Sequence, residues 1–319
     1  MRDTDYAFCV ARLRANERYM LSDDDIAALI KAKDYEKTEE ILIEKGFATQ
    51  KGTVREIIGA QNDKLWQLLE SSVPSKKVLD ILCIVNDYFN IKAALKCFFT
   101  GLNPENYYIK PTTIDLQLLT KAINSLDFSA LGGEKGECAQ QAYKSACSTE
   151  NGQNAEIIID TATIYALKQY ANSKKISLVN DICAFLCDTA NIKIALRCQK
   201  AGKSKDFIET AVGECVYLER TRLVGLNTYD DLTDYLKTTR YAQGILAYEK
   251  GASDFEKWCD EKILNLCGNA KFTSFGFDPV CAFYYAKLNE IKNVRIILNC
   301  KLSGVPTEEI EQRVRGVYA

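Results

Sequence analysis

The chain has 319 residues, of which 47% are hydrophobic and 26% charged, and its formal net charge is −2. This composition is typical of a folded globular protein, and there is no excess of Lys and Arg with which to bind nucleic acid. The chain contains no histidine, which excludes Ser-His-Asp and Cys-His catalytic sites and HExxH zinc sites. Since it has only 17 Gly and 5 Pro, we expect long uninterrupted helices.

Neither a secretory signal nor a membrane span is expected. Asp3 and Asp5 stand where a signal peptide would be basic and then apolar. The most apolar long stretch, residues 79–99, is interrupted by charged and amide side chains, which a span of about 20 apolar residues would not tolerate.

Thirteen cysteines without a CxxC pair indicate reduced thiols in a cytosolic protein. The pair Cys183 and Cys187 has i,i+4 spacing on a predicted helix, which is not the usual spacing of zinc ligands. We therefore expect buried thiols that pack as small apolar groups, with no metal and no cofactor.

A motif occurs three times, about one hundred residues apart. Each copy has an acid, an Asn three residues later, a Lys or Arg two further on, and a Gly eleven residues after the Asn. The three copies consist of Asp87, Asn90, Lys92 and Gly101; Asp188, Asn191, Lys193 and Gly202; and Glu290, Asn293, Arg295 and Gly304. A Leu and a Cys also recur at +5 and +7 from each Asn, so the match is not due to chance.

A second, weaker match supports the same period. The stretches 26–35, 119–128 and 232–241 each place apolar residues at helical spacing and an aromatic residue at the ninth position after the first. The sequence therefore predicts three similar helical domains, at 1–103, 104–204 and 205–319, with the N- and C-terminal helices expected to pack together. No stretch alternates in the manner of a strand, so the predicted fold class is all-α.

The sequence predicts two helices near the C-terminus and one loop in the middle of the chain. A helix of about 25 residues is expected from Asp278, as N-cap before Pro279, to the stop at Gly304. Residues 307–318 are expected to form a last helix, with acids early and bases late. Residues 132–153, rich in Gly, Ser and charged residues, are expected to form a solvated loop with room for a short helix at 138–147.

Two features that suggest chemistry are better explained by structure. The triplet Gly202-Lys203-Ser204 lacks the first glycine of a phosphate-binding P-loop, since that position is Arg197, and it ends a helix instead of opening one. The acid runs at 23–25 and 230–231 precede apolar helical patterns, as helix N-termini do.

The acid, Asn and base of each repeat have two interpretations. They could form three copies of a binding site, or they could make buried hydrogen bonds that fix the packing of each repeat helix. Because a single catalytic centre would not need three copies, we favour the structural interpretation.

The repeat and the two chain ends resemble a known family. The stretch from Asn289 to Leu298, Gly304 and the tail from Glu309 to Tyr318 are similar to the C-terminus of the C subunit of bacterial and archaeal V/A-type ATPases, which is the d subunit in the eukaryotic vacuolar enzyme. The N-terminal stretch from Tyr6 to Leu21 is similar to the opening helix of that family. The first repeat departs most, since Phe98, Phe99 and Thr100 replace more polar residues.

The resemblance implies a funnel of three helical domains related by a pseudo-threefold axis, without enzymatic activity. It implies a central-stalk rotor subunit that joins the shaft of the soluble ATPase head to the membrane rotor ring and so couples ATP synthesis or hydrolysis to proton or sodium transport. The implied partners are the shaft subunits and the ring subunit, and the implied location is the cytoplasmic face of the membrane. The alternative is a helical repeat scaffold or adaptor unrelated to an ATPase, although such scaffolds have shorter and more numerous repeats.

Overall fold

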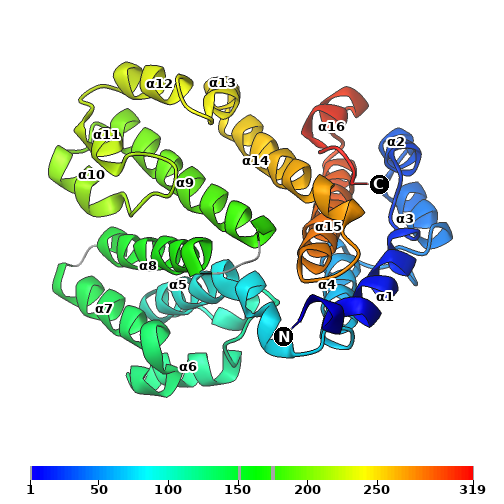
Figure 1. Ribbon diagram of the computed structural model, residues 1–319, viewed down its shortest axis with the longest axis horizontal. Coiled ribbons are helices and arrows are strands. Elements are labelled where there is room, and N and C mark those ends of the chain that lie inside the picture. Colours follow the sequence, from blue (N-terminus) through cyan, green and yellow to red (C-terminus); the bar gives the residue numbers. More distant parts are fainter. Residues whose placement is uncertain (1, 150–151, 174–176, 319) are drawn as a thin grey trace. The chain divides into compact units, whose positions relative to one another are not determined.

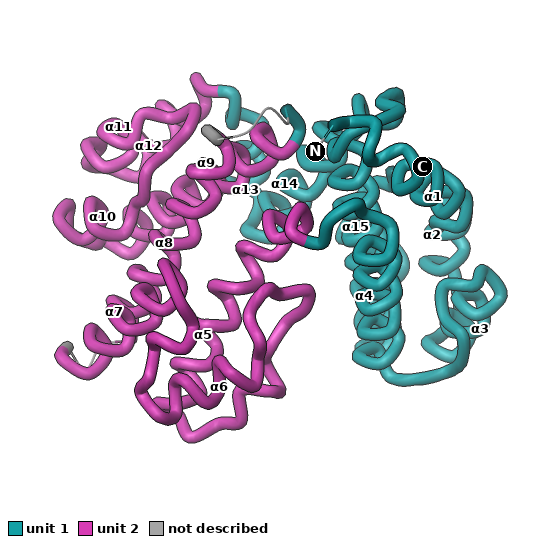
Figure 2. Tube along the Cα trace, turned by 60° about the horizontal axis from the view of Figure 1, so that its bottom comes forward, with its two compact units in different colours: residues 1–76, 176–178, 240–319 teal, residues 77–175, 179–239 magenta. Residues whose placement is uncertain are grey.

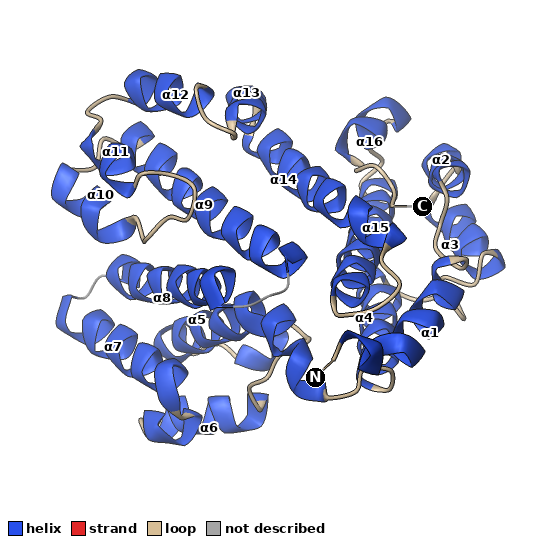
Figure 3. Ribbon diagram, viewed as in Figure 1, coloured by secondary structure: helices blue, strands red, loops and turns tan. Residues whose placement is uncertain are grey.

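The computed structural model describes residues 2–149, 152–173 and 177–318. Within these ranges every regular element is an α-helix or a 3-10 helix, and none is a strand (Figure 3). The predicted all-α class is confirmed.

The described residues form two compact units (Figure 2). Unit 1 contains residues 2–76, 177–178 and 240–318, so it includes helices from the first and the last part of the chain, and unit 2 contains the remaining described residues of 77–239. The helices of unit 1 are η1 (Asp3–Tyr6), α1 (Ala7–Glu17), α2 (Asp23–Lys31), α3 (Tyr35–Glu44), α4 (Val54–Glu70), α13 (Ala242–Lys250), α14 (Ala252–Cys267), η5 (Gly268–Phe272), α15 (Asp278–Leu302) and α16 (Thr307–Arg313).

Unit 2 contains the middle of the chain, coloured cyan to yellow in Figure 1. Its helices, each counted with the unit that holds most of it, are η2 (Lys76–Cys83), α5 (Ile84–Thr100), η3 (Pro104–Asn106), α6 (Leu116–Ser125), η4 (Phe128–Leu131), α7 (Gly133–Thr149), α8 (Gly152–Ser173), α9 (Ser177–Lys200), α10 (Lys205–Ala211), α11 (Arg220–Gly225) and α12 (Tyr229–Lys237).

The three stretches of the weaker sequence match are helical. Their apolar positions lie in α2, α6 and α12, and their aromatic residues lie beyond the ends of these helices. Each of the three helices starts after a side chain that accepts a hydrogen bond from a first-turn N–H, namely Ser22, Asp115 and Thr228. The acids at 23–25 and 230–231 lie in the first turns of α2 and α12. These carboxylates therefore stabilise helix N-termini, as the sequence predicted.

The long helix α15 has the predicted length of 25 residues and ends before Gly304. Its start differs by one position, because Asp278 is already helical, Phe277 is the N-cap, and Pro279 lies in the first turn. More than half of its residues are buried, so α15 is the central helix of unit 1.

The predicted loop at 132–153 is wrong: the short helix allowed at 138–147 is part of the longer helix α7, residues 133–149, and residues 152–153 begin α8. Residues 150–151 lie outside the described part. Cys138, Ala139 and Ala142 are buried, and α7 packs along α8 (Figure 1). A Cβ at Gly136 would come within 2.6 Å of the Phe128 carbonyl oxygen, so this glycine lets α7 approach η4 closely. The Gly and small residues that suggested a loop serve close helix packing.

The predicted last helix is also too long. The helix α16 ends at Arg313, and residues 314–318 are not helical. Val314 and Tyr318 are buried in this extended segment. The backbone of the segment is paired with side chains of α15, as described below, and this pairing competes with a further helical turn.

Candidate functional site

The Asn of each repeat motif is fully buried and binds a backbone segment that follows 19 to 23 positions later in the chain. In α5, the Nδ2 of Asn90 donates to the carbonyl oxygen of Ile109 at 2.9 Å, and its Oδ1 accepts from the Ile109 N–H at 2.9 Å. In α15, Asn293 makes the same two hydrogen bonds with Arg315, both at 2.9 Å. One amide side chain thus satisfies both backbone groups of one residue.

The middle repeat uses a variant of this arrangement. In α9, Asn191 accepts from the Gly213 N–H at 2.8 Å and donates to the Glu214 carbonyl oxygen at 2.9 Å. We call these three arrangements the Asn clamps, after Asn90, Asn191 and Asn293. Because each clamp uses the Asn both as donor and as acceptor, its Nδ2 and Oδ1 both have partners in the core.

The acid three residues earlier binds the backbone just beyond each clamp in the first two repeats. Asp87 accepts from the Thr113 N–H at 2.8 Å and is paired with the Lys135 ammonium. Asp188 accepts from two consecutive N–H groups, those of Val216 at 2.7 Å and Tyr217 at 2.9 Å. All three repeat acids are buried, so backbone N–H groups and nearby cations provide the compensation that a buried carboxylate requires.

The third acid obtains its partner from the other end of the chain. Glu290 in α15 accepts from the Leu21 N–H at 2.6 Å, and it forms a buried ion pair with Lys287. Leu21 lies two positions before α2, as Thr113 lies three positions before α6. The N-terminal segment therefore occupies, in the third repeat, the place that the continuous chain occupies in the first.

The repeat bases do not share one environment. Lys92 is paired with Asp160 on α8. Lys193 is half-buried in α9, and Arg295 is exposed on α15. The bases therefore have no common structural role, in contrast to the acids and asparagines.

The repeat glycines end their helices in the same way. Gly101, Gly202 and Gly304 all have a positive φ, between 61° and 70°. The N–H of the next residue donates to the carbonyl oxygen of the repeat cysteine, as in the bond from Val305 to Cys300 at 2.9 Å. This is the hydrogen bond of a Schellman C-cap, for which glycine is preferred because a Cβ disfavours this conformation.

Sequence reasoning singled out these twelve motif residues but not their partners. The clamped segments, around Ile109, Gly213 and Arg315, carry no common side-chain pattern, because it is their backbone that is bound. A second Asn four residues before the clamp is a sequence signal for these partners in the first and third repeats. There, Asn86 and Asn289 donate to the carbonyl oxygens of Pro111 and Gly316.

The triplet Gly202-Lys203-Ser204 and the buried cysteines take part in capping and packing. Gly202 caps α9, the Ser204 hydroxyl caps α10, and Lys203 lies over the Phe207 ring at 5.0 Å. Twelve of the thirteen thiols are buried, and burial raises the pKa of Cys183 and Cys215 to about 12. Among the described residues no group of three or more Cys, Asp or Glu side chains is placed to hold a metal ion.

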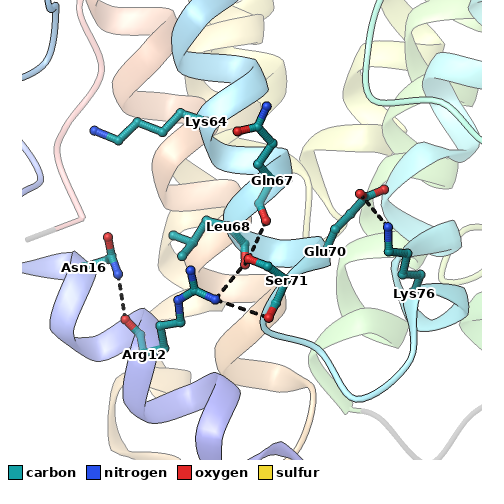
Figure 4. Close-up of a pocket in the computed structure, with 8 residues that line it drawn as sticks. All are labelled: Arg12, Asn16, Lys64, Gln67, Leu68, Glu70, Ser71 and Lys76. Carbon is teal, nitrogen blue, oxygen red and sulfur yellow. Dashed lines mark hydrogen bonds and ion pairs between the residues drawn. The ribbon is translucent and has the colours of Figure 1, made fainter.

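A polar pocket of about 680 Å³ lies between α1 and α4 in unit 1 (Figure 4). The Arg12 guanidinium donates to the Ser71 hydroxyl at 3.0 Å and to the Ser71 carbonyl oxygen at 3.2 Å. Glu70 is paired with Lys76 at 2.9 Å. The other residues that line the pocket are Asn16, Lys64, Gln67 and Leu68.

The fold is thus that of an all-helical protein with a motif used three times for internal packing, and comparison with known proteins gives its family. Residues 9–313 match the family model described as ATP synthase (C/AC39) subunit. Because the match spans nearly the whole chain, the protein belongs to this family, that of the C subunits of the V-type and A-type ATPases.

Two curated relatives are similar along almost their full lengths. The C subunit of the V-type sodium ATPase of Enterococcus hirae is 23% identical over 321 residues, which cover 96% of this chain and 97% of the relative. The C subunit of the A-type ATP synthase of Methanocaldococcus jannaschii is 24% identical over 343 residues, which cover 96% of this chain and 85% of the relative.

No helix within the described ranges is both long and apolar enough to cross a membrane. The longest helices, α9 and α15, carry charged side chains along their lengths.

Proposed function

We propose that this chain is a non-catalytic central-stalk subunit of a V/A-type ATPase. In this role it joins the shaft of the soluble head to the membrane rotor ring, at the cytoplasmic face, and couples ATP synthesis or hydrolysis to proton or sodium transport. The observation that carries the proposal is the family match over residues 9–313, together with relatives named as ATPase C subunits that align over 96% of this chain.

We further propose that the chain forms three similar helical domains arranged as a funnel about a pseudo-threefold axis. The Asn clamps support this arrangement, because each repeat helix organises the segment that follows it in the same way. The bond from Leu21 to Glu290 supports it as well, since the third repeat is completed by the N-terminal segment. Head-to-tail units that close into a ring require such a meeting of first and last elements.

The internal bonding suits a part that transmits force. Each clamp replaces solvent by two hydrogen bonds in a buried position, and each such bond contributes about 1 kcal/mol. Bonds of this kind hold the chain where it leaves a repeat helix and oppose local unfolding at that point.

The test is reconstitution of the rotor ring and the ATPase head with its shaft in lipid vesicles, with and without this chain. We expect ATP-driven ion uptake to require the chain, while the rate of ATP hydrolysis by the detached head is unchanged. Equal ion uptake per ATP hydrolysed in the absence of the chain would refute the proposal.

A further inference from the structure

The exposed side of α1 combines aromatic and basic residues. Phe8 and Arg12 are one helical turn apart on this face, with Asn16 a further turn along, and Tyr19 lies in the turn that follows the helix. Phe8 and Tyr19 are each 67% exposed. Large aromatic side chains and Arg are the residue types enriched at the centres of protein interfaces.

The pocket beside this face has more positive than negative charge. Its three cations, Arg12, Lys64 and Lys76, face a single carboxylate, and that carboxylate, Glu70, is paired with Lys76. The Lys64 ammonium makes no hydrogen bond or ion pair with any residue in the described ranges (Figure 4). Two positive charges thus remain uncompensated on a chain whose net charge is −2.

A purely structural role accounts for part of this surface only. Arg12 binds Ser71 at the C-terminal end of α4, where a cation is favoured by the helix dipole. That role accounts for the hydrogen bonds of only one guanidinium nitrogen of Arg12, Nη1. It explains neither the unpaired Lys64 nor the exposure of Phe8, and the Tyr19 ring stays exposed although Arg18 lies over it at 4.9 Å.

The surface also fits a protein segment better than a lipid surface. Binding to anionic membranes uses clusters of about four to eight basic residues. This pocket has only two uncompensated cations, and the exposed aromatic side chains of the α1 region suit a folded partner. The volume of about 680 Å³ is larger than one carboxylate needs and accommodates several side chains of a helix.

We propose that the α1–α4 surface, formed by Arg12 and Lys64 in this pocket together with the exposed rings of Phe8 on α1 and Tyr19 just after it, binds an acidic amphipathic segment of another subunit of the ATPase. This inference rests on the proposed function, since the partner is a subunit of the same complex. The carboxylates of the segment pair with Arg12 and Lys64, and its apolar side chains contact Phe8 and Tyr19.

The experiment compares two variants with the same change in net charge. Arg12→Gln with Lys64→Glu alters the α1–α4 surface. Lys31→Gln with Lys33→Glu alters exposed residues at the end of α2 instead. Each tagged chain is produced as the sole copy, the complex is purified from detergent-solubilised membranes, and the partner subunits that stay bound are measured as salt is raised.

A photo-cross-linking residue at Gln67, which lines the pocket, identifies the bound segment in the otherwise unaltered complex. We expect cross-linking to a stretch of another subunit that contains Asp or Glu. We also expect the Arg12/Lys64 variant to hold that subunit at least about tenfold more weakly than the Lys31/Lys33 variant, while both variants keep a cooperative thermal unfolding transition.

The outcomes separate the two proposals. If the wild-type chain retains the ATPase subunits and the Arg12/Lys64 variant retains them equally well, the inference is wrong and the proposed function stands. Cross-linking only within this chain, to lipid, or to a segment without acids also overturns the inference. If the wild-type chain retains no ATPase subunit, the proposed function fails and the inference fails with it.

Discussion

At the scale of single residues, the same amide side chain solves the same problem three times. A segment that leaves a helix and runs over the core must satisfy its N–H and C=O groups without a helix or sheet of its own. The side chains of Asn90, Asn191 and Asn293 supply both a donor and an acceptor at one point. An Asp at these positions would supply only an acceptor, and a Leu would supply neither a donor nor an acceptor.

Replacement of a clamp asparagine should therefore be costly. We expect Asn293→Ala to lower the free energy of unfolding by about 3 kcal/mol, because the N–H and C=O of Arg315 would both stay buried without a partner. The measurement is urea denaturation followed by circular dichroism. Asn299→Ala, at an exposed position of the same helix, is the control and should change stability by less than about 0.5 kcal/mol. Equal effects of the two substitutions would contradict this role of Asn293.

Thiol chemistry should also be confined to one residue. All thirteen cysteines lie in the described residues, and only Cys147 is exposed. Burial raises the pKa of Cys138 and Cys267 to about 12, which removes the reactive thiolate at neutral pH. We expect one fast-reacting thiol per native chain with a disulfide reagent, absent in Cys147→Ser and retained in Cys138→Ser. A second fast thiol in the native protein would show that a buried site opens.

At the scale of elements, the glycine that ends each repeat helix fixes where the following segment starts. Gly304 has φ of +66°, and no atom lies within 4 Å of a Cβ built there. Glycine is therefore preferred at position 304 because of its backbone conformation, and not because a side chain would lack space.

A pair of glycine substitutions separates conformation from packing. We expect Gly304→Ala to destabilise the protein by about 1 to 2 kcal/mol, since Ala disfavours a left-handed conformation. Gly59→Ala, inside α4 with open space around it, should stabilise it by up to about 1 kcal/mol. Both are measured by urea denaturation, and a stabilising Gly304→Ala would refute the assigned conformation.

Much of the helical fold could be predicted from the sequence, because the signals are local. The helix starts at the acid runs 23–25 and 230–231, the length of α15 and the stop at Gly304 all depend on neighbouring residues. The full length of α7 could not be predicted in this way, because its packing against η4 depends on Gly136, whose use is visible only when the Phe128 carbonyl is in place.

The candidate sites were predictable in part. The recurrence of Asn293 marked it as structurally important, but its partner Arg315 is bound through the backbone and leaves no side-chain signature. The end of α16 at Arg313 could not be predicted for the same reason, since a local helix pattern competes with a pairing that the sequence does not display. The surface at Arg12 and Lys64 carries no motif, so only the fold brings these residues together.

At the scale of the whole molecule, the lack of histidine determines how stability varies with pH. No side chain of this chain has an ordinary pKa between those of the carboxylates and the thiols. On the acidic side, the Lys45 ion pair lowers the pKa of Asp25, so its contribution is present above its ordinary pKa of 3.8 and is lost as pH falls through the folded value.

Above neutral pH the dependence is opposite: the stability of the fold decreases as pH rises. Burial raises the pKa of thiols such as Cys183 from 9.0 to about 12, so the unfolded chain releases protons that the folded chain retains. Their contribution is complete below pH 9 and is lost as pH rises towards 12. We expect a melting temperature that is flat between about pH 6 and 8 and falls steadily above about pH 9, measured by differential scanning fluorimetry. A change of several degrees within the flat range would contradict it.

The bond between Leu21 and Glu290 has a consequence for synthesis of the chain. The two residues are 269 positions apart, so α1 to α4 are made long before α15 can cover them. Contacts of such long range form slowly, and the uncovered apolar faces are open to aggregation in the interval. We therefore expect the nascent N-terminal helices to expose apolar surface until α15 has been translated and has packed against them.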